Sequence, residues 1–573
     1  MSPENLSLRT VNQYRTRDIF AYLGLRYYFA NLCTRRDRWA IDVSAHLVSS
    51  NKDPSYFSSL HFKERLEDGS ISHREIFIPG PNEAYAEAAL LAECANYSEF
   101  KQSSSVFSYA LTSRDDSKGM YAPYFAGLQE RHRAISKACS GTVGQVVLYT
   151  DIKRFYPSIS LEVARQAWRQ ACDKSKITAN YRTLGDKLLS HHDKASKATP
   201  NNRGLLTGPM FSHLIANLVL RDLDEEMSAS FPGRYFRYVD DVVLVGTKDQ
   251  VAAGRELIES RLRTLGLELH GEGSGKDFQI STDAWMIGAE DFDDSISKGW
   301  MTLSRNVKQF LLTQPQYATY LSEAFISRDF RIPLPDYQVA VQDSGYKDRF
   351  NDSLKRHPWL LKTIYRDITP EKLIEAAESL RQNYADNLNG LLGFGCDIDG
   401  YQRKRLIPKI RYFAGRLLYL ARKPDLISIS RKLSEYPELY MLAEIMAAVA
   451  TRDVSKLLPL GSNAVQSAAQ VLSLDISPVE CRIETWGKAE LQGMAILRAH
   501  GIFLDGPDDD ELNKFVLWGK DSKSLMHSKN SFMQELACLH GVSPTARHRS
   551  MLITAFGRGE ELAFDATSPL ETY

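Results

Sequence analysis

The stretch Arg237-Tyr-Val-Asp-Asp-Val-Val-Leu-Val-Gly246 decides the fold, because strand-forming residues stand on both sides of a polar Asp240-Asp241 pair. Aromatic and β-branched residues favour strands, so we predict two short strands across 235–245 that meet at a polar turn. Such a hairpin would present two carboxylates at the end of a buried sheet. Asp-Asp pairs without these flanking strands also occur at 115–116, 293–294 and 508–510.

A third carboxylate, Asp151, ends an apolar strand-like run at 145–150, within Leu148-Tyr-Thr-Asp-Ile-Lys-Arg-Phe-Tyr-Pro157. If the two strand regions are neighbours in one sheet, three carboxylates converge at the same edge. Their mutual repulsion calls for cations, and two Mg²⁺ ions about 3.5–4 Å apart, with Mn²⁺ as the alternative, serve in-line nucleotidyl transfer. The competing interpretation is a set of turn aspartates at solvated hairpin tips.

The composition is that of a soluble globular protein with two or three domains. The chain has 573 residues, 43% of them hydrophobic and 25% charged, and its 71 Lys plus Arg balance 71 Asp plus Glu. This length exceeds what one compact core usually holds. Because proteins that coat long duplexes carry a basic excess, zero net charge favours nucleic acid held in a local groove.

The cysteines and the N-terminus predict a cytoplasmic protein. The seven cysteines are scattered without a C-x-x-C spacing, which is typical of reduced thiols. Residues 1–18 lack the apolar core of a secretory signal. The longest apolar-rich stretch, 439–450, is too short to span a bilayer and contains Glu444, so we expect no membrane partner.

Changes of pattern along the chain predict three regions and an α+β fold class. Residues 1–140 form a mixed N-terminal extension, residues 141–300 carry strands and helices around the aspartates, and residues 301–573 show helical patterns alone. The last boundary follows the acidic stretch 290–294. Short breaks between the helical segments predict antiparallel pairs, as in a solenoid or an irregular bundle. These segments are 302–325, 371–390, 403–422, 437–450, 454–473 and 487–500.

Several of these motifs resemble those of reverse transcriptases. Tyr238-Val-Asp-Asp241 resembles the Y-x-D-D motif of that family, and Asp151-Ile-Lys-Arg-Phe-Tyr156 resembles its first palm carboxylate motif. Arg203–Leu220 is similar to the Gly-rich loop and helix between the two. This chain departs from the family in having Thr207 where Gln is usual, and in lacking the usual Asn between Leu265 and Lys276.

The resemblance, which spans residues 70–285, implies a fingers and palm domain with a two-metal centre. It implies that Asp151, Asp240 and Asp241 are catalytic, and that Asp151, Ile152, Asp240 and Asp241 hold the metal. It also implies a steric gate, an aromatic ring that lies under the sugar and excludes a ribose 2′-hydroxyl. Residues implied to bind the dNTP are this gate, Tyr156, together with Gly208, Pro209, Arg74, Lys153 and Lys276, with Arg114 as a further cation.

The region after residue 300 indicates which group of reverse transcriptases this chain resembles. It has no basic thumb and no metal-binding Cys/His cluster, and it carries helices with balanced charge. This arrangement resembles the abortive-infection reverse transcriptases of the AbiK type, including prophage-encoded members, which join a thumbless polymerase domain to a helical HEAT-like domain. The resemblance implies homo-oligomers, untemplated synthesis from dNTPs, single-stranded DNA attached covalently to a tyrosine, and a role in stopping phage infection.

A protein primer needs a hydroxyl that can reach the metal site, and coordination to Mg²⁺ would favour the phenolate of a tyrosine. Tyr14 is preferred because it lies among polar residues, including two arginines that could steer a triphosphate. The N-terminal candidates are Tyr14, Tyr22, Tyr27 and Tyr28, and the C-terminus adds Tyr573.

Two other functions stay open. An RNA-templated reverse transcriptase, retron-like or intron-like, would need a template grip, which the missing basic thumb and Thr207 disfavour. A non-enzymatic defence scaffold would work through the helical region, and the intact set of three aspartates argues against it.

Overall fold

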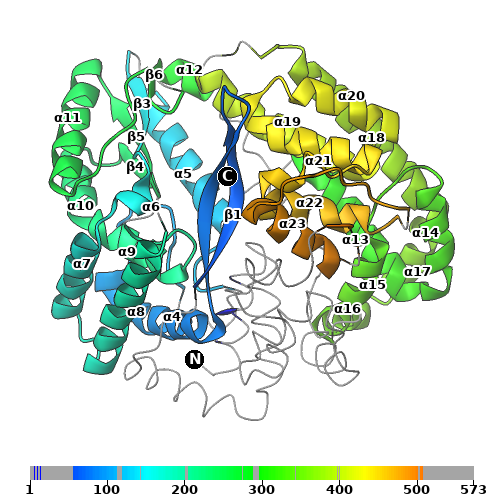
Figure 1. The fold of residues 1–573 in the computed structure, drawn as a ribbon, viewed down its shortest axis with the longest axis horizontal. Coiled ribbons are helices and arrows are strands. Elements are labelled where there is room, and N and C mark those ends of the chain that lie inside the picture. Colours follow the sequence, from blue (N-terminus) through cyan, green and yellow to red (C-terminus); the bar gives the residue numbers. More distant parts are fainter. Residues whose placement is uncertain are drawn as a thin grey trace.

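The chain folds into two antiparallel β-sheets surrounded by many helices, so its class is α+β (Figure 1). The structure is a computed structural model that describes residues 56–506, apart from short gaps, together with residues 6, 9, 10 and 13. The gaps are 113–118, 142–143, 200–203, 274, 288–295, 342–343, 397, 399, 476, 501 and 503. The acidic stretch 290–294 therefore lies outside the described residues.

The elements fall into two groups of helices with a hairpin between them (Figure 1). The first group comprises α4 (Pro81–Cys94), η1 (Ser98–Phe100), α5 (Tyr124–Cys139), α6 (Phe155–Ser158), α7 (Leu161–Lys174), α8 (Ala179–Lys197), α9 (Met210–Val219), α10 (Arg221–Ser230), α11 (Lys248–Thr264) and α12 (Thr282–Met286). The second group, called the helical half below, comprises α13 (Lys298–Thr313), η4 (Pro315–Tyr317), α14 (Ala318–Ile326), α15 (Leu334–Val341), α16 (Ser344–Arg356), α17 (Trp359–Asp367), α18 (Pro370–Leu392), α19 (Gly400–Leu420), α20 (Lys423–Leu433), η5 (Pro437–Leu439), α21 (Tyr440–Thr451), η6 (Leu458–Leu460), α22 (Ser462–Leu472) and α23 (Lys488–Ala499).

The hairpin consists of β1 (Tyr56–Arg65) and β2 (Ile71–Pro79), which pair antiparallel with a bulge at Lys63. The second sheet has the order β4-β5-β3-β6, with β3 (Val146–Asp151), β4 (Tyr235–Tyr238), β5 (Asp241–Gly246) and β6 (Phe278–Ser281). Each pair of neighbouring strands in this sheet is antiparallel. The strands expected on both sides of Asp240 and before Asp151 are therefore confirmed.

Alternate residues of β3 and β5 point into two different cores, as the two-residue period of a strand requires. Leu148 and Leu244 belong to the large core that includes side chains of α7, α9 and α11. Tyr149 and Val243 belong to a smaller core on the other face, with side chains of α5 and α12. Both faces of the sheet are thus covered by apolar side chains.

Several expected helices in the helical half are shorter than their periodicity predicted. The segment 302–325 divides into α13 and α14, because Pro315 lacks the backbone N–H that a continuous helix needs. The segment 454–473 is helical as α22 only from Ser462, after a 3₁₀ turn that includes Pro459 and after Gly461, whose φ is +98°. The segments 371–390 and 403–422 correspond to α18 and α19.

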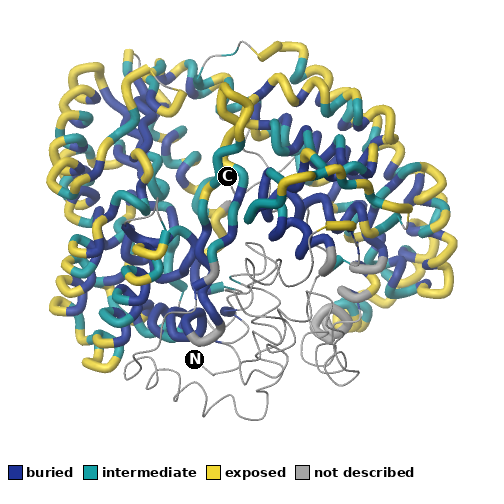
Figure 2. Tube along the Cα trace, in the orientation of Figure 1, coloured by how far each residue is buried: buried dark blue, intermediate teal, exposed yellow. Residues whose placement is uncertain are grey.

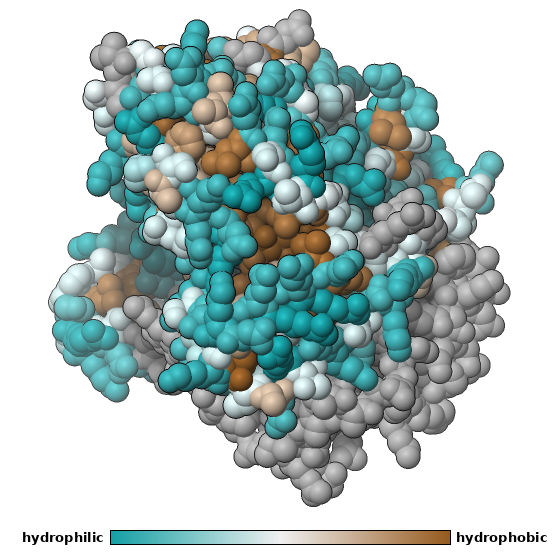
Figure 3. All heavy atoms as spheres, turned by 90° about the vertical axis from the view of Figure 1, so that its left-hand side faces the viewer, coloured by the Kyte–Doolittle hydropathy of each residue, from teal (hydrophilic) through white to brown (hydrophobic). Residues whose placement is uncertain are grey.

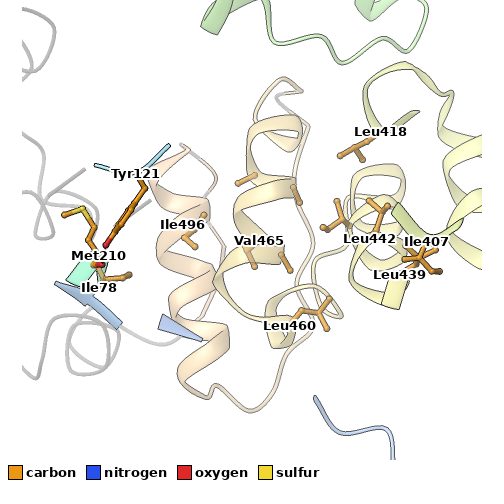
Figure 4. Close-up of a cluster of buried hydrophobic side chains, with 14 of the residues drawn as sticks. Ile78, Tyr121, Met210, Ile407, Leu418, Leu439, Leu442, Leu460, Val465 and Ile496 are labelled. Atoms are coloured by element: carbon orange, nitrogen blue, oxygen red, sulfur yellow. Dashed lines mark hydrogen bonds between the residues drawn. The ribbon is translucent and has the colours of Figure 1, made fainter. Parts of the chain in front are cut away.

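One hydrophobic core runs through both groups of helices. It joins Ile78 of β2 and Met210 of α9 to Val465 of α22 and Leu442 of α21 (Figure 4). Figure 2 shows buried residues in the interiors of both groups. Because apolar burial is the main stabilising contribution to folding, the helical half is held to the rest of the chain by the same core.

The face of the molecule that carries α7, α10 and α11 is mostly polar (Figure 3). Hydrophilic side chains on this face surround a smaller apolar area (Figure 3). Among the described residues, no helix combines the length and the apolar character needed to cross a membrane.

The free edge of β1 is paired by side chains of the helical half. Gln492 of α23 accepts a hydrogen bond from the Leu60 backbone N–H at 2.9 Å and donates one to the Ser58 carbonyl at 2.8 Å. Asn463 of α22 accepts from the Phe62 N–H at 2.9 Å. These two amides, called the amide clamp below, replace a neighbouring strand at an edge that would otherwise leave backbone groups unpaired.

We predict that Gln492→Leu lowers the free energy of unfolding by about 1–3 kcal/mol, because it leaves two backbone groups of β1 without their partner inside the protein. Gln382→Leu, at an exposed position of α18, is the matched control. Urea unfolding measures both variants. Equal stability of the two would show that β1 does not depend on the amide clamp.

Candidate active site

The pairing of β3 with β5 brings the three aspartates to one edge of the sheet. The register places Asp151 directly opposite Asp241. Asp240 lies in the two-residue turn between β4 and β5, and its carbonyl accepts a hydrogen bond from the Ile152 backbone N–H at 3.1 Å. The convergence expected from the sequence is therefore present in the structure.

The turn that carries Asp240 has an unusual backbone. Val239 has a φ of +56°, in the left-handed region that β-branched residues rarely adopt. Its N–H donates to the Ser108 hydroxyl at 2.9 Å, and its carbonyl accepts from Arg237 at 2.7 Å. Arg237 is fully buried and forms an ion pair with Asp224 at 2.6 Å. These contacts hold Val239 in its strained conformation.

Burial and repulsion by neighbouring carboxylates make Asp240 and Asp151 harder to ionise. Burial, followed by the charges of Asp241 and Asp151, raises the pKa of Asp240 to about 7. Burial and the charge of Asp241 also raise the pKa of Asp151. Lys276 and His270 act against this second shift, since Lys276 Nζ lies 3.4 Å and His270 Nε2 lies 3.7 Å from the Asp151 carboxylate.

Asp241 has its own set of partners. The Tyr149 hydroxyl donates a hydrogen bond to its carboxylate, and Arg131 Nη1 of α5 lies 4.0 Å from the other oxygen. Lys404 Nζ lies 3.1 Å from the centre of the Tyr149 ring. Burial lowers the pKa of Lys404 to about 8, although the charges of Asp241 and Asp151 oppose this shift.

Lys404 belongs to α19, so the helical half contributes a cation to this edge of the sheet. The start of α19 is fixed by Tyr401, whose hydroxyl donates to the Trp285 carbonyl at 2.7 Å. The two rings also stack, with centroids 5.3 Å apart. Sequence reasoning missed Lys404, Arg131, His270 and Tyr149, because no motif marks them and their positions depend on tertiary packing.

The donor atoms at this edge fit a magnesium-type ion, because Mg²⁺ prefers hard oxygen ligands. Burial and the neighbouring carboxylates raise the pKa of Asp151 and of Asp240, and a bound cation would oppose both shifts. Among the described residues, however, no three or more His, Cys, Asp or Glu side chains are arranged so that they could hold a metal ion. The chemistry of the donors fits the metal, and their arrangement is not a formed metal site.

The expected floor of the nucleotide site is a tight loop. Gly208 has a φ of +121°, and a Cβ at this position would lie 2.3 Å from the Phe77 carbonyl oxygen. The Phe77 N–H donates to the Thr207 carbonyl at 2.8 Å, which holds the loop against β2. Only glycine fits position 208. Pro209 follows as the N-cap of α9.

The other residues predicted to bind the nucleotide or to prime synthesis differ in how far they are buried and in whether the structure describes them. Tyr156 is half-buried on α6, and its hydroxyl is 2.6 Å from His213 Nδ1. Arg74 is exposed on β2, opposite His61 of β1. The side chain of Lys153 is exposed, while its N–H donates to the Glu268 carbonyl at 2.8 Å. Arg114, Tyr14, Tyr22, Tyr27, Tyr28 and Tyr573 lie outside the described residues.

Comparisons with known proteins do not assign this chain to a family. No family model matches the chain, and no curated protein matches it. Among solved structures it is similar to apo telomerase from Candida tropicalis, with a TM-score of 0.30 and 10% sequence identity, over 67% of this chain and 69% of that one. A similarity at this level carries no argument about what this chain does.

We predict that Asp240→Asn changes how stability depends on pH in metal-free protein. Because the folded chain raises the pKa of Asp240 from 3.8 to about 7, it binds this proton more tightly than the unfolded chain does. The resulting stabilisation is complete below the ordinary pKa and is lost as the pH rises through about 7. The parent should therefore lose stability relative to Asp240→Asn between about pH 4 and about pH 7.

Thermal unfolding in a chelator at several pH values measures this difference, with Asp249→Asn at an exposed position of α11 as the control. A constant difference between the parent and Asp240→Asn across this range would contradict the raised pKa.

Proposed function

We propose that this chain is a reverse-transcriptase-like DNA polymerase that joins deoxynucleotides by nucleotidyl transfer at Asp151, Asp240 and Asp241. The observation that supports this proposal best is the β3–β5 register, which sets Asp151 opposite Asp241 with Asp240 in the adjacent turn. Three carboxylates at one sheet edge, in the sequence contexts that resemble the palm motifs, are what this chemistry requires.

In this proposal Asp151, Asp240 and Asp241, with the backbone carbonyl of Ile152, hold two Mg²⁺ ions, and Mn²⁺ is the alternative. When bound, these ions activate the attacking hydroxyl and stabilise the leaving pyrophosphate. Lys276 contributes positive charge beside Asp151, where it lies 3.4 Å from the carboxylate. A cation at this place can compensate the charge of a triphosphate.

The nucleotide would lie between the aspartates and the loop against β2. Gly208 and Pro209 form its floor, in the loop that the hydrogen bond from the Phe77 N–H to the Thr207 carbonyl holds against β2. Tyr156 is the steric gate that meets the sugar, and the exposed cations Arg74 and Lys153 contact the phosphates. Arginine suits this role because its planar fork can donate two parallel hydrogen bonds to phosphate.

The proposed priming, product and biological role rest on the resemblance to abortive-infection reverse transcriptases of the AbiK type. In this proposal residues 301–573 form a HEAT-like domain in place of a thumb, and the protein works as a homo-oligomer in the cytoplasm. It makes untemplated single-stranded DNA attached to one of its own tyrosines and thereby stops phage infection. The contact of Lys404 with Tyr149 supports a polymerase centre that works together with the helical half.

We predict that Asp151→Asn and Asp240→Asn each abolish nucleotide incorporation, because each removes a charge that the metal needs without changing the volume of the side chain. Asp241→Asn should also be severe. Labelled dNTPs with Mg²⁺ and no template, followed by a denaturing gel, measure the activity, and Asp249→Asn is the control. Full polymerisation by Asp240→Asn would falsify the two-metal assignment.

Adding RNA to the same assay separates the other functions. Synthesis only with added RNA would favour a templated enzyme, and a parent chain that incorporates nothing under either condition would favour a non-enzymatic scaffold.

We predict that the DNA product is attached covalently to a tyrosine outside the described residues, with Tyr14 as the first candidate and Tyr22, Tyr27 and Tyr28 as the others. A phenol near the metal site can be deprotonated and attack the first triphosphate. Peptide mass mapping after nuclease trimming would identify the attached residue. Tyr14→Phe, compared with Tyr22→Phe, should then lose the adduct. An adduct on serine or threonine, or synthesis without an adduct, would contradict tyrosine priming.

A further inference from the structure

The hydroxyl of Tyr156 is held by a buried histidine. Tyr156 lies on the short helix α6, and its hydroxyl oxygen is 2.6 Å from Nδ1 of His213, the fourth residue of α9. The residue His213 is only 4% exposed. A hydrogen bond to a buried partner restricts the ring of Tyr156, because the other orientations of the side chain would lose it.

The histidine is in turn fixed by aromatic rings. Tyr109 stacks on the His213 imidazole with a centroid distance of 3.8 Å and an interplanar angle of 5°. Tyr121 meets the imidazole edge-on at 6.1 Å, and its hydroxyl donates to the Met210 carbonyl at 2.8 Å. The plane of the imidazole is therefore set by two rings from outside α9, and the hydrogen bond with the Tyr156 hydroxyl places Nδ1 on the side of α6.

The segment 105–109 connects this support to the turn that carries Asp240. Its backbone runs beside β4, with the Arg237 N–H donating to the Ser105 carbonyl at 2.8 Å and the Phe107 N–H donating to the Arg237 carbonyl at 3.0 Å. The Ser108 hydroxyl accepts from the Val239 N–H, and the next residue, Tyr109, stacks on His213. One short segment thus positions both the catalytic turn and the ring that holds Tyr156.

We propose that His213 is a positioning residue that sets the selectivity for deoxyribose over ribose by fixing the ring of Tyr156. The inference rests on the proposed function, in which Tyr156 meets the sugar of the incoming nucleotide. A ring held on one side of the site presents a constant surface to the 2′ position, and a ring free to swing leaves room for a 2′-hydroxyl. The competing role is purely structural, as a member of an aromatic cluster.

Four variants separate these roles. His213→Phe keeps a ring to stack on Tyr109 and removes the hydrogen bond, and Tyr156→Phe removes the hydroxyl from the other side. Loss of a hydrogen bond of this kind should lower the ratio of dNTP to rNTP incorporation efficiency about 2- to 10-fold. The double variant should be no worse than either single one, because both remove the same interaction. His213→Asn, whose side-chain amide can replace Nδ1, should restore most of the ratio.

His191→Phe is the control, since it replaces a buried histidine of α8 outside this cluster. Melting temperatures report the effect of each variant on the fold. A lower melting temperature of His213→Phe with an unchanged sugar ratio would overturn the proposal, as would additive effects in the double variant.

A second readout keeps this test independent of synthesis. Protection of the parent and of His213→Phe against thermal unfolding by dATP or ATP, in the presence of Mg²⁺, measures the sugar preference in binding. A parent that prefers dATP but makes no product would contradict the polymerase function, and the role of His213 would then be judged on the binding ratio. A parent that prefers neither nucleotide in binding or synthesis would overturn the role of His213.

Discussion

The antiparallel register of β3 and β5 is the constraint on which the candidate site depends. It sets Asp151 opposite Asp241, and a shift of one residue would turn either side chain to the other face of the sheet. The pairing of β4 with β5, which sets Tyr238 opposite Asp241, leaves only two residues for the turn between these strands. Two-residue turns often need a positive φ at their first position, which here falls on Val239. The strained valine is therefore a consequence of bringing the aspartates together.

Three carboxylates at one half-buried edge repel one another, and the surrounding chain supplies positive charge that offsets part of this repulsion. The cations come from elements that are far apart in the sequence and pack together at this edge of the sheet. Lys276 precedes β6, Arg131 lies on α5, and Lys404 lies on α19. The helical half is thus bound to the site through charge, in addition to the shared core and the amide clamp.

The sequence could predict the elements that carry the aspartates, because their signal is local. Apolar and β-branched runs before Asp151 and on both sides of the Asp240-Asp241 pair mark strands without knowledge of the rest of the chain. The strand β1 escaped prediction because its residues alternate poorly, and its edge is completed by amides about 400 positions later in the chain. Lys404 and His213 could not be predicted as site residues either, since each acquires its neighbours only when distant helices pack together.

Several residues with a strained backbone conformation lie near the candidate site. Among the described residues, five other than glycine have a positive φ, and three of these are Tyr109, Arg154 and Val239. Arg154 directly precedes α6, which carries Tyr156, and the other two belong to the supports of the gate and of the turn. Each such conformation costs about 1–2 kcal/mol, so it persists only where other contacts determine it. For Val239 these contacts come from Ser108 and from Arg237, which the buried ion pair with Asp224 holds in place. For Tyr109 they include its stacking on His213. The stability of this region and the geometry of the site therefore depend on the same contacts.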